Sequence, residues 1–242
     1  MNAIEIRGLT KQFKARTAVD HLELTVGQGE CFALLGANGA GKTTTVRMLC
    51  GLTAPTEGDA LVMGHSIRSD SGEVKRALSV SPQETAVAPR LTVRENLVLM
   101  ARLHDMDAKA AAQRAEQLMA ELSLADRAKD RAGKLSGGLQ RRLSIAMALV
   151  SDPQVLFLDE PTLGLDVRVR RELWQLVSAL KQKMTVVLTT HYLEEAEAMA
   201  DRIGVMNTGR LVALGTVEQI KQVAGKDTLE DAFLALTEEV GA

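Results

Sequence analysis

The stretch that decides the fold is "ECFALLGANGAGKTTTVRMLCGL", which runs from Glu30 to Leu52. Its first part, up to Gly36, is almost continuously apolar and ends in a glycine cluster, as a buried central strand of a parallel sheet does. The part after Gly41 favours a helix, and Gly51 marks its end. A buried strand, a glycine-rich loop and a helix in this order predict an α/β fold.

The loop "GANGAGKT", from Gly36 to Thr43, fits the pattern G-x-x-x-x-G-K-[ST] in full. Glycines let successive backbone N–H groups approach and surround phosphate oxygens. The pattern assigns Lys42 to the β- and γ-phosphates and the Thr43 hydroxyl to Mg²⁺. A glycine-rich turn that binds nothing is the alternative, but the strand before the loop and the helix after it favour a phosphate site.

A second acidic site is needed to complete a magnesium shell. The stretch "VLFLDE", Val155 to Glu160, predicts a buried strand that delivers two carboxylates at its end. We expect Asp159 to hold Mg²⁺ through water and Glu160 to polarise an attacking water. The alternative is that both carboxylates are simply solvated at the end of the strand. The phosphate loop elsewhere in the chain favours the magnesium site over this alternative.

Two more polar residues follow predicted strands. His191 comes directly after "MTVVLTT", and Gln83 ends "LSVSPQ". Because the carboxyl ends of neighbouring parallel strands face the same ligand crevice, we expect His191 to contact the γ-phosphate. The signal from Gln83 alone is weaker, since a glutamine at a strand end can also cap a turn.

The order of the remaining elements predicts one domain with an insertion. "AIEIRGL" and "HLELTV" alternate as two antiparallel strands near the N-terminus. From about residue 90 to 150 the pattern is helical, and strands and helices alternate afterwards. We therefore expect residues 1–242 to form one domain, with a core at about 1–89 and 151–242 and a helical part at about 90–150.

A second helix start is rich in small residues. In "LSGGLQRRLSIAMALV", Leu135 to Val150, a serine and two glycines open the helix, so a ligand could reach its free N–H groups and positive dipole end. The spacing predicts one buried stripe formed by Leu139, Leu143, Ala146, Met147 and Val150. Arg141 and Arg142 are expected outside that stripe. The chain thus carries two phosphate-binding helix starts.

Composition narrows the class of protein. Of 242 residues, 46% are hydrophobic and 25% charged, which is ordinary for a globular chain. The net charge of −2 disfavours a dedicated nucleic-acid binder. Cys31 and Cys50 lie in apolar segments and are expected to be buried free thiols. No signal peptide or membrane span is visible, so we expect a cytoplasmic protein that reaches a membrane only through a partner.

These motifs together resemble those of the ATP-binding cassette (ABC) ATPases, the nucleotide-binding subunits of ABC transporters, over essentially the whole chain. The resemblance implies a P-loop NTPase core of the RecA-like kind, with a mainly parallel sheet, an N-terminal antiparallel β subdomain and a helical insertion. In that family two subunits pack head to tail. The serine-glycine-glycine signature of each one caps the γ-phosphate of the ATP held by the other, which explains the second helix start.

The resemblance assigns a role to each motif residue. ATP would be bound by Phe13, which stacks on adenine, and by the Walker A loop, namely Gly36, Ala37, Asn38, Gly39, Ala40, Gly41, Lys42, Thr43 and Thr44. Mg²⁺ would be held by Thr43, Gln83 and Asp159, and catalysis would use Glu160, His191, Gln83 and Lys42. The partner's ATP would be contacted by the signature residues Ser136, Gly137, Gly138 and Gln140 and by Asp166 of the D-loop.

Two positions depart from the usual family pattern. Leu139 stands where the signature usually has glutamine, and Gln140 follows it. The serine and both glycines remain, so binding of the γ-phosphate is expected to survive, whereas the role of the fifth position is open. Phe13 stands where tyrosine is commoner, but its ring keeps a face for stacking.

Three stretches resemble the ABC-2-type exporters, a branch that includes drug-resistance and lipid or polysaccharide exporters. They are "SPQETAVAPRLTVRENL", "TTHYLEEAEAMADRIGVMNTGRLVALGT" and "TLEDAFLALT". The resemblance implies integral membrane permease subunits and a place on the cytoplasmic face of the membrane, with no nucleic acid bound. The second ATPase subunit is either another copy or a paralogue, and two intact half-sites suit a homodimer. Pro89 to Asn96 is expected to contribute to the permease contact.

Two other classes of protein remain as alternatives. An ABC ATPase acting on nucleic acid or the ribosome typically has a long coiled-coil insertion, zinc-spaced cysteines, a second cassette or a basic tract, and none is present in this sequence. A P-loop kinase or GTPase has no use for "LSGGLQ", and the chain has no NKxD-type guanine motif. The sequence therefore favours the transporter ATPase.

Overall fold

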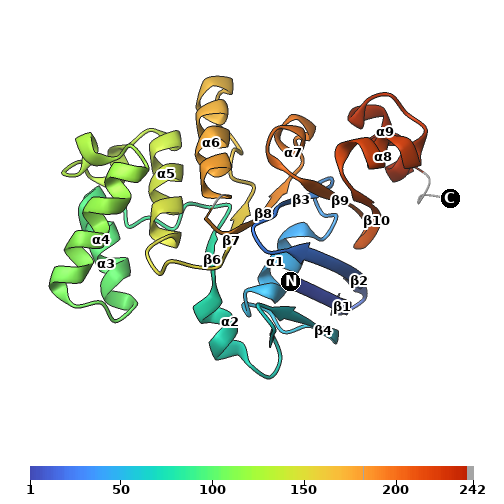
Figure 1. The fold of residues 1–242 in the computed structure, drawn as a ribbon, viewed down its shortest axis with the longest axis horizontal. Helices are drawn as coiled ribbons and strands as arrows, with labels where there is room; N and C mark the ends of the chain where they lie inside the picture. The colour runs from blue at the N-terminus through green and yellow to red at the C-terminus, as the bar shows by residue number, and fades with distance from the viewer. Residues whose placement is uncertain (182, 239–242) are drawn as a thin grey trace.

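The computed structural model describes residues 1–181 and 183–238, which form two β-sheets and the helices around them (Figure 1). The larger sheet has six strands in the order β10 (Arg210–Gly215), β9 (Arg202–Asn207), β3 (Cys31–Leu35), β8 (Thr185–Thr190), β7 (Val155–Asp159) and β6 (Leu78–Ser81). All neighbours pair in parallel except β10, which is antiparallel to β9. The predicted α/β class with a mainly parallel sheet is confirmed.

The central strands are buried on both faces. Every residue of β3, β7 and β8 is buried, and their side chains alternate between two hydrophobic cores. Cys31, Ala33 and Leu35 join the core beneath the helical side, whereas Phe32 and Leu34 join the core shared with the second sheet. Burial on both faces explains the continuous apolar run that the sequence shows there.

The second sheet is antiparallel and contains the N-terminus. Its order is β2 (Arg16–Gly27), β1 (Asn2–Phe13), β4 (Glu57–Val62) and β5 (His65–Ser66). Ile4, Ile6 and Leu9 of β1 share a core with Val46 and Met48 of α1 (Lys42–Leu49). Helix α1 is therefore held between the two sheets, and the expected antiparallel β subdomain is confirmed.

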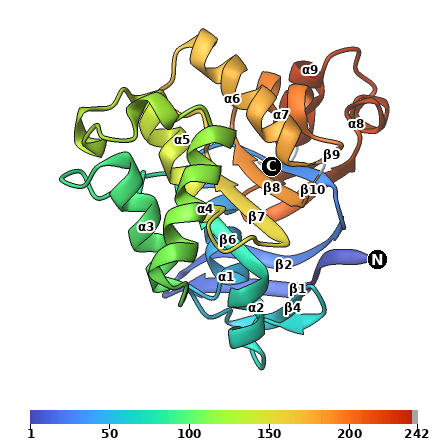
Figure 2. The ribbon, with the colours of Figure 1, turned by 60° about the vertical axis from the view of Figure 1, so that its left-hand side comes forward.

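Helices gather at one end of the molecule, next to β6 and β7 (Figures 1 and 2). They are α3 (Val93–Leu103), α4 (Ala108–Glu121) and α5 (Gly137–Ala148), with two 3₁₀ turns, η1 (Ala125–Arg127) and η2 (Ala132–Lys134), between α4 and α5. A capping box between Thr92 and Glu95 opens α3, and the Asp107 side chain caps α4. These elements form the expected helical part; the domain limits at about 90 and 150 stay a prediction.

The other helices cover the sheets or follow the last strand. They are α2 (Ser71–Ala77), α6 (Val167–Leu180), α7 (Leu193–Met199), α8 (Val217–Ala224) and α9 (Leu229–Glu238). α6 and α7 lie side by side over the six-stranded sheet, and α8 and α9 lie beyond β10 (Figure 1). Within the described residues, none of the helices combines the length and apolar character that crossing a bilayer requires.

One prediction about α5 is wrong. Arg141, expected outside the buried stripe, is only 5% exposed. Its guanidinium donates to the carbonyl oxygens of Pro82 and Gln83 at 2.6 and 2.5 Å, so two backbone acceptors beyond the end of β6 satisfy a charged group that periodicity assigns to solvent. Arg142 is more exposed and pairs with Glu172 at 2.6 Å.

Candidate functional site

The loop between β3 and α1 depends on glycines. Gly39 and Gly41 have φ of 85° and 107°, a region that side chains with a Cβ rarely adopt. A Cβ on Gly41 would lie 2.5 Å from the Ala18 carbonyl oxygen, and one on Gly36 would lie 2.5 Å from that of Met206. Gly36 and Gly41 are therefore needed for the loop to pass close to two neighbouring backbones, and Gly39 is needed for its backbone conformation.

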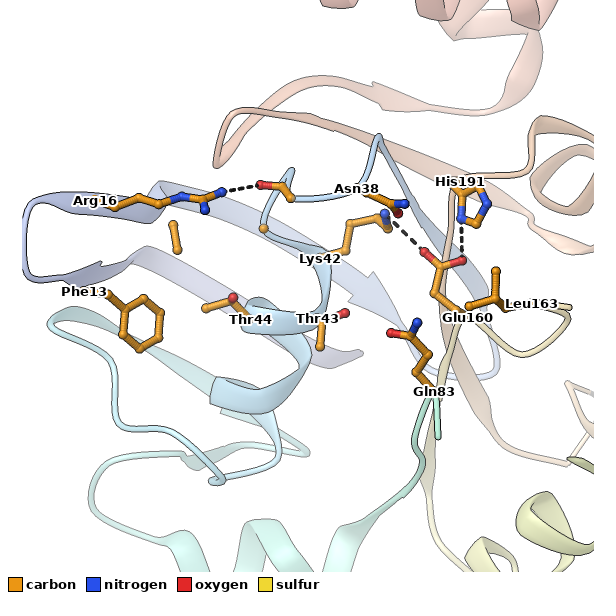
Figure 3. A pocket seen from close by; sticks show the side chains of 13 residues that line it. Phe13, Arg16, Asn38, Lys42, Thr43, Thr44, Gln83, Glu160, Leu163 and His191 are labelled. Atoms are coloured by element: carbon orange, nitrogen blue, oxygen red, sulfur yellow. Dashed lines mark hydrogen bonds and ion pairs between the residues drawn. The ribbon is translucent and has the colours of Figure 1, made fainter. Parts of the chain in front are cut away.

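A cavity of about 560 Å³ opens beside this loop (Figure 3). Its lining residues are Phe13, Arg16, Ala18, Asn38, Gly39, Gly41, Lys42, Thr43, Thr44, Gln83, Glu160, Leu163 and His191. Gln83, Glu160 and His191 follow the carboxyl ends of β6, β7 and β8, so the predicted strand-end residues do meet at one edge of the sheet. The volume lies in the range of small-molecule sites.

Lys42 lines the cavity and is 5% exposed. Its ammonium donates to the carbonyl oxygens of Gly36 at 2.7 Å and Ala37 at 3.2 Å. It also pairs with Oε1 of Glu160 at 3.2 Å (Figure 3). A phosphate that binds this lysine must therefore compete with a buried carboxylate.

Two of the predicted magnesium ligands are already in contact. The Thr43 hydroxyl donates to Oδ1 of the buried Asp159 at 3.1 Å, and Gln83 lines the same cavity. No group of three or more His, Cys, Asp or Glu that could hold a metal occurs in the part of the chain that the structure describes. A few oxygens at a phosphate loop suit Mg²⁺, which usually takes one or two carboxylates plus substrate phosphates and water.

The backbone of Glu160 has a strained conformation that orients its side chain. Its φ is 48°, and its N–H donates to both the carbonyl and the hydroxyl oxygen of Thr189, which holds that conformation. One carboxylate oxygen contacts Lys42, and the other lies 2.8 Å from Nδ1 of His191. The arrangement places a general-base candidate between a phosphate-binding cation and an imidazole.

Phe13 lies at the opposite end of the cavity from Glu160 and His191 (Figure 3). Half of its surface is exposed, and the Lys11 ammonium lies 5.0 Å from the centre of its ring. Arg16 also reaches the loop, because its guanidinium donates to the carbonyl oxygen of Gly39 at 3.3 Å. An exposed aromatic ring is suited to stacking against a nucleobase.

The signature residues do not line this cavity. Ser136 caps α5 through the Leu139 N–H, and Ser136 and Gly137 are exposed. The Gln140 amide donates to the carbonyl oxygen of Leu135 at 3.1 Å, so this side chain turns back on its own loop. Asp166 caps α6 through the Val169 N–H at 3.0 Å. Within one chain these residues stay apart from the Walker A loop, and their action across a dimer stays a prediction.

Sequence reasoning missed three residues that support the site. Thr189 donates to Oδ1 of Asp159 at 2.5 Å while it holds Glu160, Arg16 reaches the loop at Gly39, and Arg141 holds the backbone at Gln83. No spacing pattern marks any of them. Cys31 and Cys50 are buried and free, as predicted, and burial raises the pKa of each thiol to about 12.

Comparison with known proteins points in the same direction as this geometry. A family model described as "ABC transporter" matches residues 19–163. The daunorubicin/doxorubicin resistance ATP-binding protein DrrA of Streptomyces peucetius is 46% identical over 229 residues, which cover 94% of this chain and 69% of that protein. The Nod factor export ATP-binding protein I of Burkholderia lata is 42% identical over 229 residues, covering 94% and 75%.

A solved structure has the same architecture. It is described as that of an ATP-binding subunit of an ABC transporter, and it matches with a TM-score of 0.85 at 27% sequence identity. The match covers 97% of this chain and 99% of the other. Nearly the whole fold of this chain therefore has a counterpart in one known structure.

Proposed function

Since the chain belongs to the ABC transporter family and is the ATP-hydrolysing subunit of an exporter, we propose that two copies bind two Mg·ATP between them. ATP binding closes this dimer, and hydrolysis opens it again. A ligand shifts such an equilibrium only by its differential contacts with the two states. Here those contacts are the ones that each γ-phosphate makes with the second copy.

One observation carries the dimer proposal: of the two helix starts rich in small residues, the one at Gly41 lines the cavity and the one at Ser136 and Gly137 does not. The other, at Ser136 and Gly137, is exposed and already capped. Its N–H groups and positive dipole end suit an anion that its own chain does not bring to it. A second copy, packed head to tail, would supply that anion as the γ-phosphate of its ATP.

The geometry supports a direct hydrolysis step. When ATP binds, the Lys42 ammonium leaves the Glu160 carboxylate and contacts the phosphates instead. Thr43 and Asp159 would hold Mg²⁺, which would neutralise part of the phosphate charge. Glu160 accepts a proton from water as the water oxygen bonds to the γ-phosphorus and the bond to the bridging oxygen breaks. His191, oriented by Glu160, contacts the γ-phosphate.

The relatives' names support drug or Nod factor export as the kind of transport. We infer that a membrane-embedded partner selects the cargo and holds this chain at the cytoplasmic face. The family match favours this function over an ATPase that acts on nucleic acid or the ribosome. ATP is hydrolysed in either case, so ATPase activity alone does not separate the two.

We propose that the membrane partner inserts into the groove where α1, β6, α3 and α5 meet. It has a volume of about 270 Å³, and its lining includes Leu52, Met100 and His104. Leu52 is 61% exposed, although it is a large apolar side chain. The sequence predicts that Pro89 to Asn96 contacts the permease, but Asn96 itself is unsuited to such a contact. Its side chain is fully buried, and its amide group forms hydrogen bonds with the backbone of the same loop.

The groove can be tested apart from the ATPase. Leu52→Asp should leave hydrolysis by the purified chain unchanged and abolish export in cells that contain the permease. Leu234→Asp, at an exposed apolar position on α9, is the matched control and should leave both unchanged. Loss of hydrolysis in the Leu52 variant would show that this position serves the ATPase itself.

The variant Glu160→Gln tests the dimer and the catalytic role together. Removing a general base usually costs about 10²–10⁴ in rate, so turnover should fall by that order. The variant should still bind ATP and shift from monomer to dimer with Mg·ATP, as followed by analytical ultracentrifugation. Full turnover would remove Glu160 from the mechanism, and a monomer at saturating ATP would contradict the shared sites.

A further inference from the structure

A buried acid lies directly behind the catalytic residues. Glu195, in the first turn of α7, is 0% exposed and is absent from the lining of the nucleotide cavity. The Thr190 hydroxyl donates to its Oε2 at 2.5 Å, and the Tyr192 N–H donates to that hydroxyl at 2.9 Å. These two hydrogen bonds connect Glu195 to the residues on both sides of His191. Glu195 therefore stabilises the loop that carries the histidine.

Within the described residues, the second carboxyl oxygen of Glu195 is one of a few buried polar atoms that have no hydrogen-bond partner. This Oε1, the Thr162 hydroxyl and the Trp174 indole N–H are all buried, and none makes a hydrogen bond of ordinary geometry. Thr162 and Trp174 are nevertheless close enough to lower the pKa of Glu195. An unused acceptor thus lies beside two unused donors, and leaving such groups unpaired is costly.

Figures 1 and 2 show how the elements that carry these residues are arranged. α6, which carries Trp174, and α7 lie side by side over β7 and β8. Glu160 follows β7 directly, and Thr162 comes two residues later; His191 follows β8. This packing brings Glu195 into contact with the loop of His191, through Thr190, and close to the loop that follows Glu160.

We propose that Glu195 is a positioning residue for ATP hydrolysis: its carboxylate joins the His191 loop to the Glu160 loop by accepting hydrogen bonds from both Thr190 and Thr162. The proposal rests on the ATPase function above. Glu195 does not touch the nucleotide, and no bond to it forms or breaks in the reaction. It acts through the 2.8 Å contact between His191 and Glu160, because a misplacement of about 1 Å in such a contact costs up to about 100-fold in rate.

The ionised form of Glu195 is the one that fits. Three donors surround the carboxyl, namely Thr190, Thr162 and Trp174, and only the carboxylate accepts from all of them without bringing a proton of its own. Burial, and then the charge of Glu160, raise the pKa of Glu195 to about 7. The carboxyl therefore takes up a proton as the pH falls below about 7, and turnover should fall with it.

Other charged or titratable groups also face this region. They are Glu160 after β7, His191 and Tyr192 after β8, Cys31 on β3, Arg141 on α5 and Arg170 on α6. Because these groups surround Glu195, the comparison must be made between variants that differ at Glu195 alone. Glu195→Gln keeps the size of the side chain and removes its charge. Glu197→Gln is the matched control, since Glu197 is exposed on the same helix.

The experiment measures ATP turnover by the purified full chain from about pH 6 to 9, together with KM for ATP and Tm. For Glu195→Gln we expect kcat to fall about 10- to 100-fold at pH 8, with KM and Tm close to those of the wild type. The part of the decline below about pH 7 that comes from Glu195 should be missing from the pH profile of this variant. Glu197→Gln should keep the wild-type rate and profile.

A second pair of variants tests the loop partner. Thr162→Val removes the hydroxyl at nearly constant volume and should lower kcat as Glu195→Gln does, whereas Thr162→Ser should retain it. The proposal is overturned if Glu195→Gln keeps the wild-type kcat and acid limb, or if Thr162→Val has the activity of Thr162→Ser. It is equally overturned if kcat, KM and Tm all deteriorate together, which is the behaviour of a purely structural acid. A wild-type chain without ATPase activity would instead contradict the function itself.

Discussion

The ion pair between Lys42 and Glu160 predicts that a catalytically impaired variant binds nucleotide more tightly. In Glu160→Gln the ammonium of Lys42 loses its carboxylate partner at 3.2 Å and keeps only the carbonyls of Gly36 and Ala37. Incoming phosphates then no longer compete with a charged group for the lysine. They also meet one negative charge fewer in the cavity.

The size of the effect follows from the distance and the burial of the pair. Two unit charges 3.2 Å apart attract by about 5 kcal/mol at an effective dielectric constant of about 20. Both groups lose hydration when they are buried, and this cost offsets most of the attraction. The net stabilisation by the ion pair is therefore about 1–2 kcal/mol, which is in the range of a hydrogen bond to a charged group. We therefore expect the Kd of nucleotide to fall about 5- to 30-fold.

ADP is the appropriate ligand for this measurement, because it lacks the γ-phosphate through which the second copy would add affinity. Calorimetric titration of Mg·ADP into the wild type and Glu160→Gln should show the lower Kd in the variant. Glu197→Gln removes a charge without freeing Lys42 and should leave the Kd unchanged. An equal or higher Kd in Glu160→Gln would refute the competition between Glu160 and phosphate.

Three further predictions concern stacking, packing and thiol exposure. Phe13→Ala should raise the Kd of ATP about 5- to 150-fold in a fluorescence titration, the usual contribution of base stacking, whereas Phe13→Tyr should not. In Gly138→Ala the new Cβ would lie 2.4 Å from Cγ1 of Val169, so thermal unfolding should show a loss of about 1–3 kcal/mol, and Val169→Ala should recover much of it. Burial raises the pKa of the Cys31 and Cys50 thiols to about 12, so a thiol reagent at about pH 8 should label the native chain far more slowly than the urea-unfolded chain; equal rates would contradict their burial.

The parts of the site that the sequence predicts are those fixed by local spacing. Lys42 follows a glycine loop, and Asp159, Glu160 and His191 each follow a buried strand. Parallel strands bring such ends to one edge of a sheet whatever the details of packing. The fold class, the antiparallel subdomain and the buried cysteines follow from the same short-range patterns.

What the sequence does not show depends on partners that are remote along the chain. Arg141 is buried because the carbonyls of Pro82 and Gln83 accept its hydrogen bonds, and periodicity contains no information about them. Thr189 and Glu195 likewise look like ordinary strand and helix residues. Their contacts with Asp159 and Thr190 appear only when β7, β8 and α7 are packed together.

The central claim is that each ATP is hydrolysed between two copies, and mixing two inactive variants tests it most directly. Lys42→Met disables the phosphate loop, and Ser136→Asp keeps a side chain that caps α5 while its charge repels the partner's γ-phosphate. Neither variant should hydrolyse ATP alone. When the two variants are mixed in equal amounts, half of the dimers should contain one chain of each kind. Each such mixed dimer has one intact site of two, so about a quarter of the wild-type turnover should return. No recovery above the separate variants, from folded chains that form mixed dimers, would contradict the shared site.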